Sequence, residues 1–398
     1  MTSDERAAQA ALIEAMTSHT VWLQRAATAQ VNESRALLDT LAGRFYGELS
    51  SRLDNLTQAE RMAFMAGRYH TSRLKGLRNV IERFAETLDS DFRQLSIDGL
   101  ERLAGYEAGY ARDLIARVTD GDVPDALGAA VVMRQAMQTP VFGQMVDELL
   151  ADVSERTRNQ VYSRLRQGFA DGDANSNIVR ALRGTKALGF KDGVLNWTQR
   201  NIETAVRTAR AHTSNVAYDE SYRVLGVREV RFSATLDMRT TKRCAALDGA
   251  VFDAEGQHPK PPLHYNCRSQ LVPHFDSAGG KRPFVSSLKV RSGYRFTEDG
   301  ERVARSPHYR SIGNMTAKQR EDAKLKVGQV DASTSYAQWL KRQPAEAQRE
   351  WLGESRYKLW RDGNYELSRF SDPRTGREYS LDELRARDRA TFADIFGN

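Results

Sequence analysis

The 398-residue sequence has only two cysteines, Cys244 and Cys267. Two cysteines cannot build the disulfide framework of a small secreted domain, so we expect synthesis in a reducing compartment. The sequence also lacks any apolar run near the roughly 18 residues that cross a bilayer, which predicts a soluble protein without a membrane partner. The N-terminal stretch MTSDERAAQAALIEAM carries acidic residues and no apolar core, so we expect no secretory signal.

Proline is absent before Pro124, and eight of the ten prolines follow residue 258. Because proline interrupts helical hydrogen bonding, the early sequence can form long helices whereas the later sequence cannot. Two early stretches repeat apolar residues at a spacing of three or four, as one face of a helix requires. The first contains Leu38, Leu41, Phe45, Leu49, Leu53 and Leu56, and the second contains Leu74, Leu77, Ile81, Phe84, Leu88, Phe92 and Leu95. The second seam fits a helical hairpin or coiled coil that packs as a core, with a partner-binding stripe as the alternative.

Later in the chain the hydrophobic period changes from that of a helix to that of a strand. Val230, Phe232 and Ala234 alternate with polar residues, and the Asp248-Gly249 turn precedes a second short apolar stretch. The sequence therefore predicts a mainly α fold, in which long N-terminal helices and a helical core precede a small α+β module with short strands, an extended arm and a helical tail. The predicted segments are 1–123 for the long helices, 124–226 for the helical part of the core, 227–275 for the β-rich module with its Cys/His loop, 276–332 for the arm and 333–398 for the tail.

Positive charge is in excess, since 59 Lys and Arg residues face 52 Asp and Glu residues and give a formal net charge of +7. Such a balance favours contact with polyanions such as nucleic acid. Basic and aromatic residues alternate in the predicted arm, where the candidate nucleic-acid contacts are Lys281, Arg282, Arg291, Arg295 and Arg302. Because acidic residues interrupt this basic run, an arm that lies against protein is the favoured alternative.

Sulfur and imidazole groups gather around the stretch PPLHYNCRSQL, residues 261–271. A loop that carries His264 and Cys267, facing Cys244 from a preceding turn, suits zinc. A structural zinc site takes four ligands. By proximity in the sequence, the candidates for the fourth are Asp237, Asp248 and His258. The alternatives are small buried cysteines beside a hydrogen-bonded histidine, or a disulfide between the two cysteines formed in oxidising surroundings.

The same stretch is expected to act as a structural clasp. Its prolines fix an extended approach, and His264 and Cys267 turn back toward Cys244. Arg268 then ties the loop to a carboxylate such as Asp237. A cross-link or a metal at this place would add to the stability of strands that are too short to be stable alone.

Motifs of common enzyme families are missing, because the sequence has no P-loop, no Gly-rich dinucleotide turn and no Gly-x-Ser-x-Gly. We therefore assign no catalytic residue and expect a protein that is not an enzyme. A metal-dependent His-type nuclease acting on DNA is the alternative, for which Asn266 beside His264 offers a partial pattern. Such a nuclease needs a further histidine or a His/Asp pair, and His258 and His274 have no matching pattern around them.

Several spaced motifs occur in one order in the second half of the chain. An Asp-x-Arg-Thr follows a strand, a Leu-Asp-Gly forms a turn, and a Pro-rich loop closes in His-x-x-Cys-Arg. These motifs comprise Asp237, Arg239, Thr240, Leu247, Asp248, Gly249, Pro261, Pro262, His264, Cys267 and Arg268. Their order resembles the conserved core of the Mu-F-like minor head proteins of tailed bacteriophages, the head morphogenesis family, over residues of about 140 to 275. Where members with a fuller cysteine set carry further cysteines, this sequence has Thr241 and Ser269.

The resemblance implies a minor structural protein of the virion, made in the host cytoplasm and placed in few copies inside the head near the portal vertex. The implied role lies in head assembly and in DNA packaging or ejection. The implied partners are the portal protein, the major capsid protein and packaged DNA, which would be contacted weakly and without sequence specificity. Zinc is the one candidate cofactor.

Overall fold

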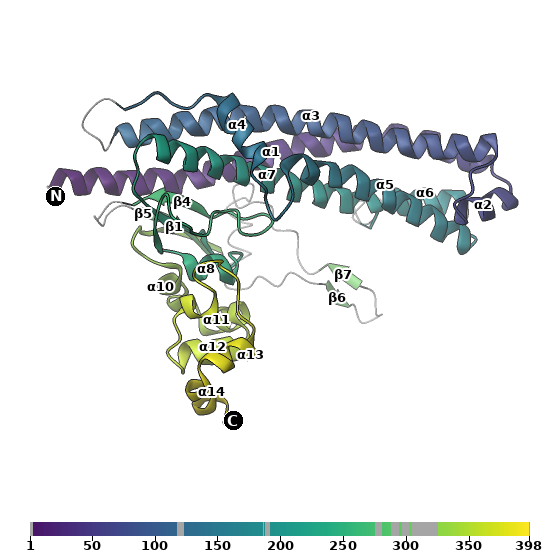
Figure 1. Ribbon diagram of the computed structural model, residues 1–398. Helices are drawn as coiled ribbons and strands as arrows, with labels where there is room; N and C mark the ends of the chain where they lie inside the picture. Colours follow the sequence, from purple (N-terminus) through teal and green to yellow (C-terminus); the bar gives the residue numbers. More distant parts are fainter. Residues whose placement is uncertain are drawn as a thin grey trace. The chain divides into compact units, whose positions relative to one another are not determined.

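The computed structural model describes residues 3–117, 123–185, 187, 192–274, 281–287, 294–296, 302–304 and 325–397. The chain forms two compact units (Figure 1). We call them the bundle unit, which comprises Ala26–Tyr106 and Gly128–Val216, and the sheet unit, which comprises Met1–Arg25, Glu107–Leu127 and Ala217–Asn398. The predicted mainly α fold class is confirmed. Within the described residues, no helix carries an apolar stretch long enough to cross a bilayer.

Helices make up the bundle unit, and three of them, α1, α3 and α7, also supply residues to the sheet unit. The helices are α1 (Ser3–Asp54), α2 (Gln58–Met65), α3 (Ser72–Ala116), α4 (Ala129–Gln138), α5 (Val146–Ala170), α6 (Asn175–Arg183) and α7 (Val194–Val224). Helix α2 begins with a capping box, for which the stretch Thr57-Gln-Ala-Glu60 is the signal in the sequence. The Thr57 side chain accepts a hydrogen bond from the Glu60 backbone N–H, and the Glu60 carboxylate accepts one from the Thr57 backbone N–H.

The apolar seam on α3 is the core of the bundle unit. Of the seven predicted seam residues, six are buried, and Leu95 is half-buried. The ring of Phe84 stacks on Phe45 of α1, with 4.3 Å between ring centroids. The predicted helix-on-helix core is therefore confirmed for this seam.

A buried glutamine joins three helices of the same unit. Gln30 of α1 donates from Nε2 to the Ser96 carbonyl of α3 at 3.3 Å and accepts from Arg210 of α7 at 2.6 Å. A Cβ atom on Gly99 would lie 2.4 Å from the Gln30 amide nitrogen, so a larger residue here would displace the Gln30 side chain from these hydrogen bonds.

Short strands and the tail helices make up the rest of the sheet unit. Strand β1 is central to a three-stranded antiparallel sheet of order β3-β1-β4, and β5 is central to a second sheet of order β2-β5-β8. The strands are β1 (Glu229–Ser233), β2 (Leu236–Asp237), β3 (Val251–Asp253), β4 (Gln270–Pro273), β5 (Lys281–Ser287), β6 (Tyr294–Phe296), β7 (Arg302–Ala304) and β8 (Leu325–Asp331). The helices are α8 (Lys242–Leu247), α10 (Tyr336–Lys341), α11 (Ala345–Leu352), α12 (Glu354–Arg361), the 3-10 helix η3 (Leu367–Phe370), α13 (Leu381–Arg387) and α14 (Arg389–Phe396).

Two apolar clusters fill the sheet unit. The first packs β1 and β4 against parts of α1, α3 and α7, and it includes Met16, Leu114, Tyr222, Phe232, Cys244, Cys267 and Leu271. The second is the core of the tail, and it includes Trp339, Tyr357, Phe370 and Leu384. Leu236 of β2 and Ala245 of α8 belong to this second cluster. The tail helices therefore pack directly on the module that holds the Cys/His loop.

The two units do not follow the five predicted segments, because α1, α3 and α7 each contribute to both. The structure also differs from the predicted extended arm at both ends of that segment. Strands β5 and β8, from the two ends of the arm, pair antiparallel along their length, and β2 pairs with β5. These ends are thus part of a sheet, while residues 305–324 lie outside the described part.

A charge placed in the α3 seam should unfold the bundle unit. Ile81 is fully buried, so an Ile81→Asp change puts a carboxylate among apolar side chains and should lower the free energy of unfolding by at least about 3 kcal/mol. Met62 is 55% exposed, and Met62→Asp serves as the matched control with little effect. Urea denaturation followed by circular dichroism measures both. A stable Ile81→Asp protein would contradict the assignment of this seam to the core.

Candidate metal centre

The Cys/His loop of the sheet unit bends sharply between His264 and Cys267. The Cys267 N–H donates to the His264 carbonyl at 3.1 Å, which closes a tight turn. Asn266 takes a left-handed backbone with φ of 59°, a conformation that asparagine tolerates better than most residues. The loop enters through the Pro261–Pro262 peptide bond, which is cis. The turn directs His264 and Cys267 toward the same neighbour, as the predicted clasp requires.

That neighbour is Cys244, which lies in the first turn of α8. The sequence predicts a turn here, and the structure has a short helix whose N-cap is Thr241. The Thr241 hydroxyl accepts a hydrogen bond from the Cys244 N–H at 3.4 Å. This cap fixes the backbone of Cys244, so the sulfur has a defined position.

The three donor atoms have the spacing of a zinc site. The Cys244 Sγ lies 3.7 Å from the Cys267 Sγ and 3.3 Å from the His264 Nε2, and all three lie within 4.8 Å of one another. Zinc–sulfur and zinc–nitrogen bonds of usual length, at tetrahedral angles, place two sulfurs about 3.8 Å apart and a sulfur and a nitrogen about 3.5 Å apart. Both cysteines are free thiols. The donor set therefore fits a zinc ion.

The histidine is oriented as a metal ligand usually is. Its Nδ1 lies 2.9 Å from the Tyr265 carbonyl, and since a carbonyl only accepts, Nδ1 carries the proton. In the neutral ring the other nitrogen, Nε2, has a lone pair, and this nitrogen lies 3.3 Å from the Cys244 sulfur. Metal-binding histidines commonly donate their second nitrogen to a backbone carbonyl in this way.

The electrostatics of the two sulfurs are asymmetric. The hydrogen bond from the Cys244 thiol outweighs burial and, together with His264, holds the pKa of Cys267 well below its ordinary value. The pKa of Cys244 is raised, mainly by the same hydrogen bond and secondly by burial. Burial lowers the pKa of His264, but the nearby Cys267 sulfur outweighs it and the net direction is upward. The site thus favours negative charge on Cys267, which is the form that binds a metal.

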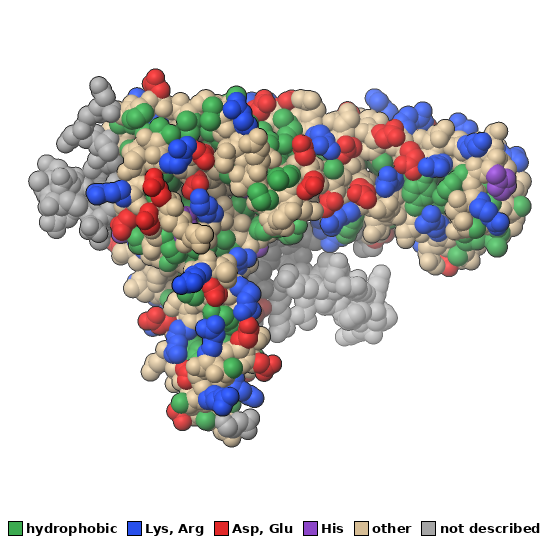
Figure 2. Space-filling view, viewed as in Figure 1, with side chains coloured by type: hydrophobic (Ala, Val, Ile, Leu, Met, Phe, Trp, Pro, Cys, Tyr) green, Lys and Arg blue, Asp and Glu red, His purple; other side chains and the backbone are tan. Residues whose placement is uncertain are grey.

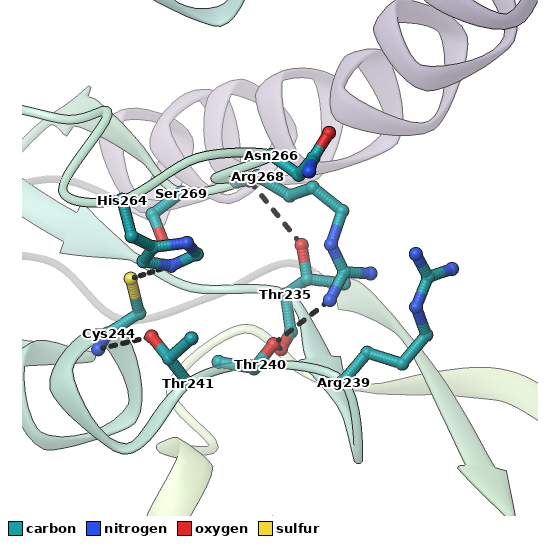
Figure 3. A pocket seen from close by; sticks show the side chains of 9 residues that line it. All are labelled: Thr235, Arg239, Thr240, Thr241, Cys244, His264, Asn266, Arg268 and Ser269. Carbon is teal, nitrogen blue, oxygen red and sulfur yellow. Dashed lines mark hydrogen bonds between the residues drawn. The ribbon is translucent and has the colours of Figure 1, made fainter. Parts of the chain in front are cut away.

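A small polar cavity adjoins this group (Figure 3). Its volume is about 20 Å³. Hydroxyl, amide and guanidinium groups line it beside Cys244 and His264, and they come from Thr235, Arg239, Thr240, Thr241, Asn266, Arg268 and Ser269. The sequence offers no periodic signal for this cavity, because its lining comes from the β1–β2 and β2–α8 connections, the start of α8 and the loop.

A buried ion pair holds the loop in place. Arg268 donates from both terminal nitrogens to the carboxylate of Asp237, with 2.7 Å from Nη2 to Oδ1. The backbone N–H groups of Arg239 and Thr240 donate to the same Oδ1, each at 3.0 Å. Burial raises the pKa of this carboxyl, but the charge of Arg268 and its hydrogen bonds outweigh burial, so the pKa of Asp237 lies below its ordinary value. The expected tie between Arg268 and Asp237 is present.

A second buried ion pair corrects one predicted nucleic-acid contact. Arg282 is 4% exposed, and its guanidinium donates to both carboxylate oxygens of Asp248 at 3.0 Å. It also donates to the carbonyls of Ala234 and Thr334. Because this guanidinium is buried and paired with a carboxylate, it is not accessible to a phosphate group of DNA. Of the other candidates, Arg291 lies outside the described residues, and Lys281, Arg295 and Arg302 are on β5, β6 and β7.

The candidates for a fourth metal ligand all have other contacts. Asp237 and Asp248 are each held by an arginine. The His258 ring stacks on the ring of Phe252, with 5.3 Å between the ring centroids, and the His258 Nδ1 lies 3.4 Å from the Pro259 carbonyl oxygen. Within the described residues, the group of possible metal ligands consists of Cys244, His264 and Cys267.

Comparison with known proteins agrees with the resemblance seen in the sequence. The sequence profile of the family described as "Phage Mu protein F like protein" matches residues 159–272. The matched region includes Cys244, His264 and Cys267, the three candidate metal ligands, and the carboxylates of Asp237 and Asp248. No curated protein and no solved structure gives a significant match.

Removing one partner of the Asp237–Arg268 pair should destabilise the sheet unit strongly. In Arg268→Met the carboxylate is left buried and unpaired, which should cost about 3–5 kcal/mol of unfolding free energy in urea denaturation. The double variant Asp237→Leu, Arg268→Met should cost less, since no charge is left alone. The exposed pair of Arg369 and Asp388 supplies the control, because Arg369→Met should cost under about 1 kcal/mol. Equal losses in Arg268→Met and Arg369→Met would contradict a structural role for the buried pair.

The Asp237–Arg268 pair should also make the free energy of unfolding depend on pH in the acidic range. Because the pKa of Asp237 is lowered by folding, its contribution is fully present above the unfolded value of about 3.9 and is lost as the pH falls through the folded-state pKa. Wild-type protein should therefore lose stability in acid more steeply than the double variant. Urea denaturation at a series of pH values measures the difference, and parallel curves would contradict it.

Proposed function

We propose that this chain, whose residues 159–272 match the profile of the Mu protein F-like family, is a minor head protein of a tailed bacteriophage with a structural role in head assembly. The family match is the observation that carries the proposal. The chemistry of the motif residues supports it. Asp237 and Asp248 are consumed in buried ion pairs that hold the fold, which is the use expected of residues in a structural protein.

The packing of the tail on the module gives further support. The Tyr336 hydroxyl of α10 donates to the Asp237 carbonyl at 2.9 Å, and the Trp351 indole of α11 donates to the Thr240 carbonyl at 3.0 Å. The tail thus contacts the family motif itself. A rigid module of this kind suits a component that must present fixed surfaces to neighbouring head proteins.

For partners and location, we propose the portal protein and the major capsid protein, inside the head near the portal vertex. Weak, sequence-independent contact with packaged DNA is proposed for the region of β6 and β7, where Arg295 and Arg302 lie. On the face shown in Figure 2, basic and acidic side chains are interspersed, which favours weak rather than strong binding of DNA.

Virion composition and direct binding test the function. Purified heads should contain the protein in far fewer copies than the major capsid protein, as measured by quantitative mass spectrometry. Immobilised full-length protein should retain purified portal protein, and a folded protein unrelated to phage heads serves as the control. Absence from heads, or a copy number equal to that of the major capsid protein, would contradict the proposal.

We also propose that Cys244, His264 and Cys267 hold a zinc ion that adds to the stability of the clasp. Purified protein should contain about one zinc per chain, and Cys244→Ser should lose it. His258→Ala is the matched control and should retain the metal, because His258 lies against Phe252 instead. Protein without zinc but with two titratable thiols would favour the hydrogen-bonded alternative, and loss of both thiols would favour a disulfide.

The same preparations separate the structural role from a nuclease. Wild-type protein should show no divalent-metal-dependent cleavage of plasmid DNA, whereas Cys267→Ser should lower the melting temperature and the yield of assembled heads. Cleavage that disappears in His264→Ala would favour the nuclease.

A further inference from the structure

Three protein donors leave one position of a four-coordinate ion to be filled. Cys244, His264 and Cys267 form the donor group in the part of the chain that the structure describes. The nearby carboxylates of Asp237 and Asp248 are fixed by bonds to arginines and backbone groups. Structural zinc sites are closed by four protein ligands, whereas sites with three protein ligands take the fourth from solution.

The polar cavity lies where such a ligand would enter. Two of the three donors, Cys244 and His264, line it (Figure 3). Its volume of about 20 Å³ exceeds the roughly 10–15 Å³ that one water-sized molecule needs. The metal donors therefore face a space that fits a small ligand and little more.

The hydroxyl and guanidinium groups in the cavity do not compete as metal ligands. The Thr241 hydroxyl already accepts from the Cys244 N–H as the α8 cap. Ser269 is 5% exposed and lines the cavity together with Cys244. Neutral hydroxyls are poor partners for zinc beside thiolates, and guanidinium groups have no lone pair to offer.

The charge around the cavity favours an anion. Arg239 and Arg268 both line it, and both act electrostatically on the single carboxylate of Asp237. Arg268 is paired with Asp237, and Arg239 adds a second guanidinium group to the lining of the cavity. Oriented positive groups at a site of low solvent access attract small anions.

From this geometry we infer that a metal ion held by Cys244, His264 and Cys267 has one coordination position that no protein group fills. Its fourth ligand is then a small exchangeable anion or water supplied through the cavity. The inference rests on the proposed zinc site and adds a ligand to it. It predicts that small anions in solution bind to the metal and change its set of ligands. A metal ion bound by four protein ligands would show no such change.

Cobalt loading gives a direct readout of the fourth ligand. Full-length protein is loaded with one Co²⁺ per chain, whose visible absorption depends on its ligands, and is then titrated with thiocyanate. The spectrum should change and saturate as the anion binds. In Arg239→Met, which removes one of the two guanidinium groups, the apparent affinity for thiocyanate should fall by at least about threefold.

Ser269→Cys provides the closed counterpart. Because Ser269 is buried beside Cys244, a sulfur at this position should complete four protein ligands. The cobalt spectrum of Ser269→Cys should ignore thiocyanate, and the protein should hold zinc at least about tenfold more tightly in competition with a chelator. His258→Ala changes a residue that does not line the cavity, and this variant should respond to thiocyanate as the wild type does.

The outcomes are distinct. One bound Co²⁺ with a spectrum that does not respond to thiocyanate would overturn the open site and leave the proposed zinc site standing. No uptake of either metal would overturn both. The wild-type titration decides the matter even if Ser269→Cys fails to fold, and a thiocyanate response of equal size in a folded Ser269→Cys protein would also overturn the inference.

Discussion

The carboxylate of Asp248 joins three separate parts of the sheet unit, and the arrangement of the whole unit depends on it. One oxygen accepts from the Ala234 N–H at 2.7 Å, the other accepts from the Tyr336 N–H at 2.7 Å, and Arg282 donates to both. The β-rich module, the start of the second sheet and the first tail helix therefore meet at one side chain. A buried carboxylate is costly to desolvate, so it persists only where its bonding is complete. A neutral or shorter residue at this position could not satisfy the same donors.

Asp237 likewise joins the Cys/His loop to its neighbouring segments through hydrogen bonds. It fixes Arg268, the residue next to Cys267, while its own backbone carbonyl receives the Tyr336 hydroxyl. Tyr336 thus contacts both carboxylate residues, through its N–H at Asp248 and its hydroxyl at Asp237. The strands are two to seven residues long and could not hold these segments by ladder bonds alone. Ion pairs supply a specific geometry that short strands and apolar packing leave undetermined.

Local features of this fold could be read from the sequence, and features made by distant segments could not. The α3 seam repeats every three or four residues, and the Thr57 capping box and the Asp248-Gly249 turn are local signals. The pairing of β5 with β8 joins segments about forty residues apart. Arg282 likewise looked like part of a basic run, because nothing near it in the sequence shows that Asp248 lies beside it. Asp237 and Asp248 were candidate metal ligands by proximity, but the arginines that hold them come from later in the chain.

These ion pairs also bear on what a metal would do in this protein. In a small domain that lacks other cross-links, the metal itself gathers its ligands, so four protein ligands are needed to hold the fold. Here the Thr241 cap positions Cys244, and the Arg268–Asp237 pair positions the loop that carries His264 and Cys267, without help from an ion. Donors that are already in place lose little conformational entropy when they bind, so three of them can hold an ion that would otherwise need four. A frame built on arginine and carboxylate is therefore what would allow the fourth position to be left to solvent.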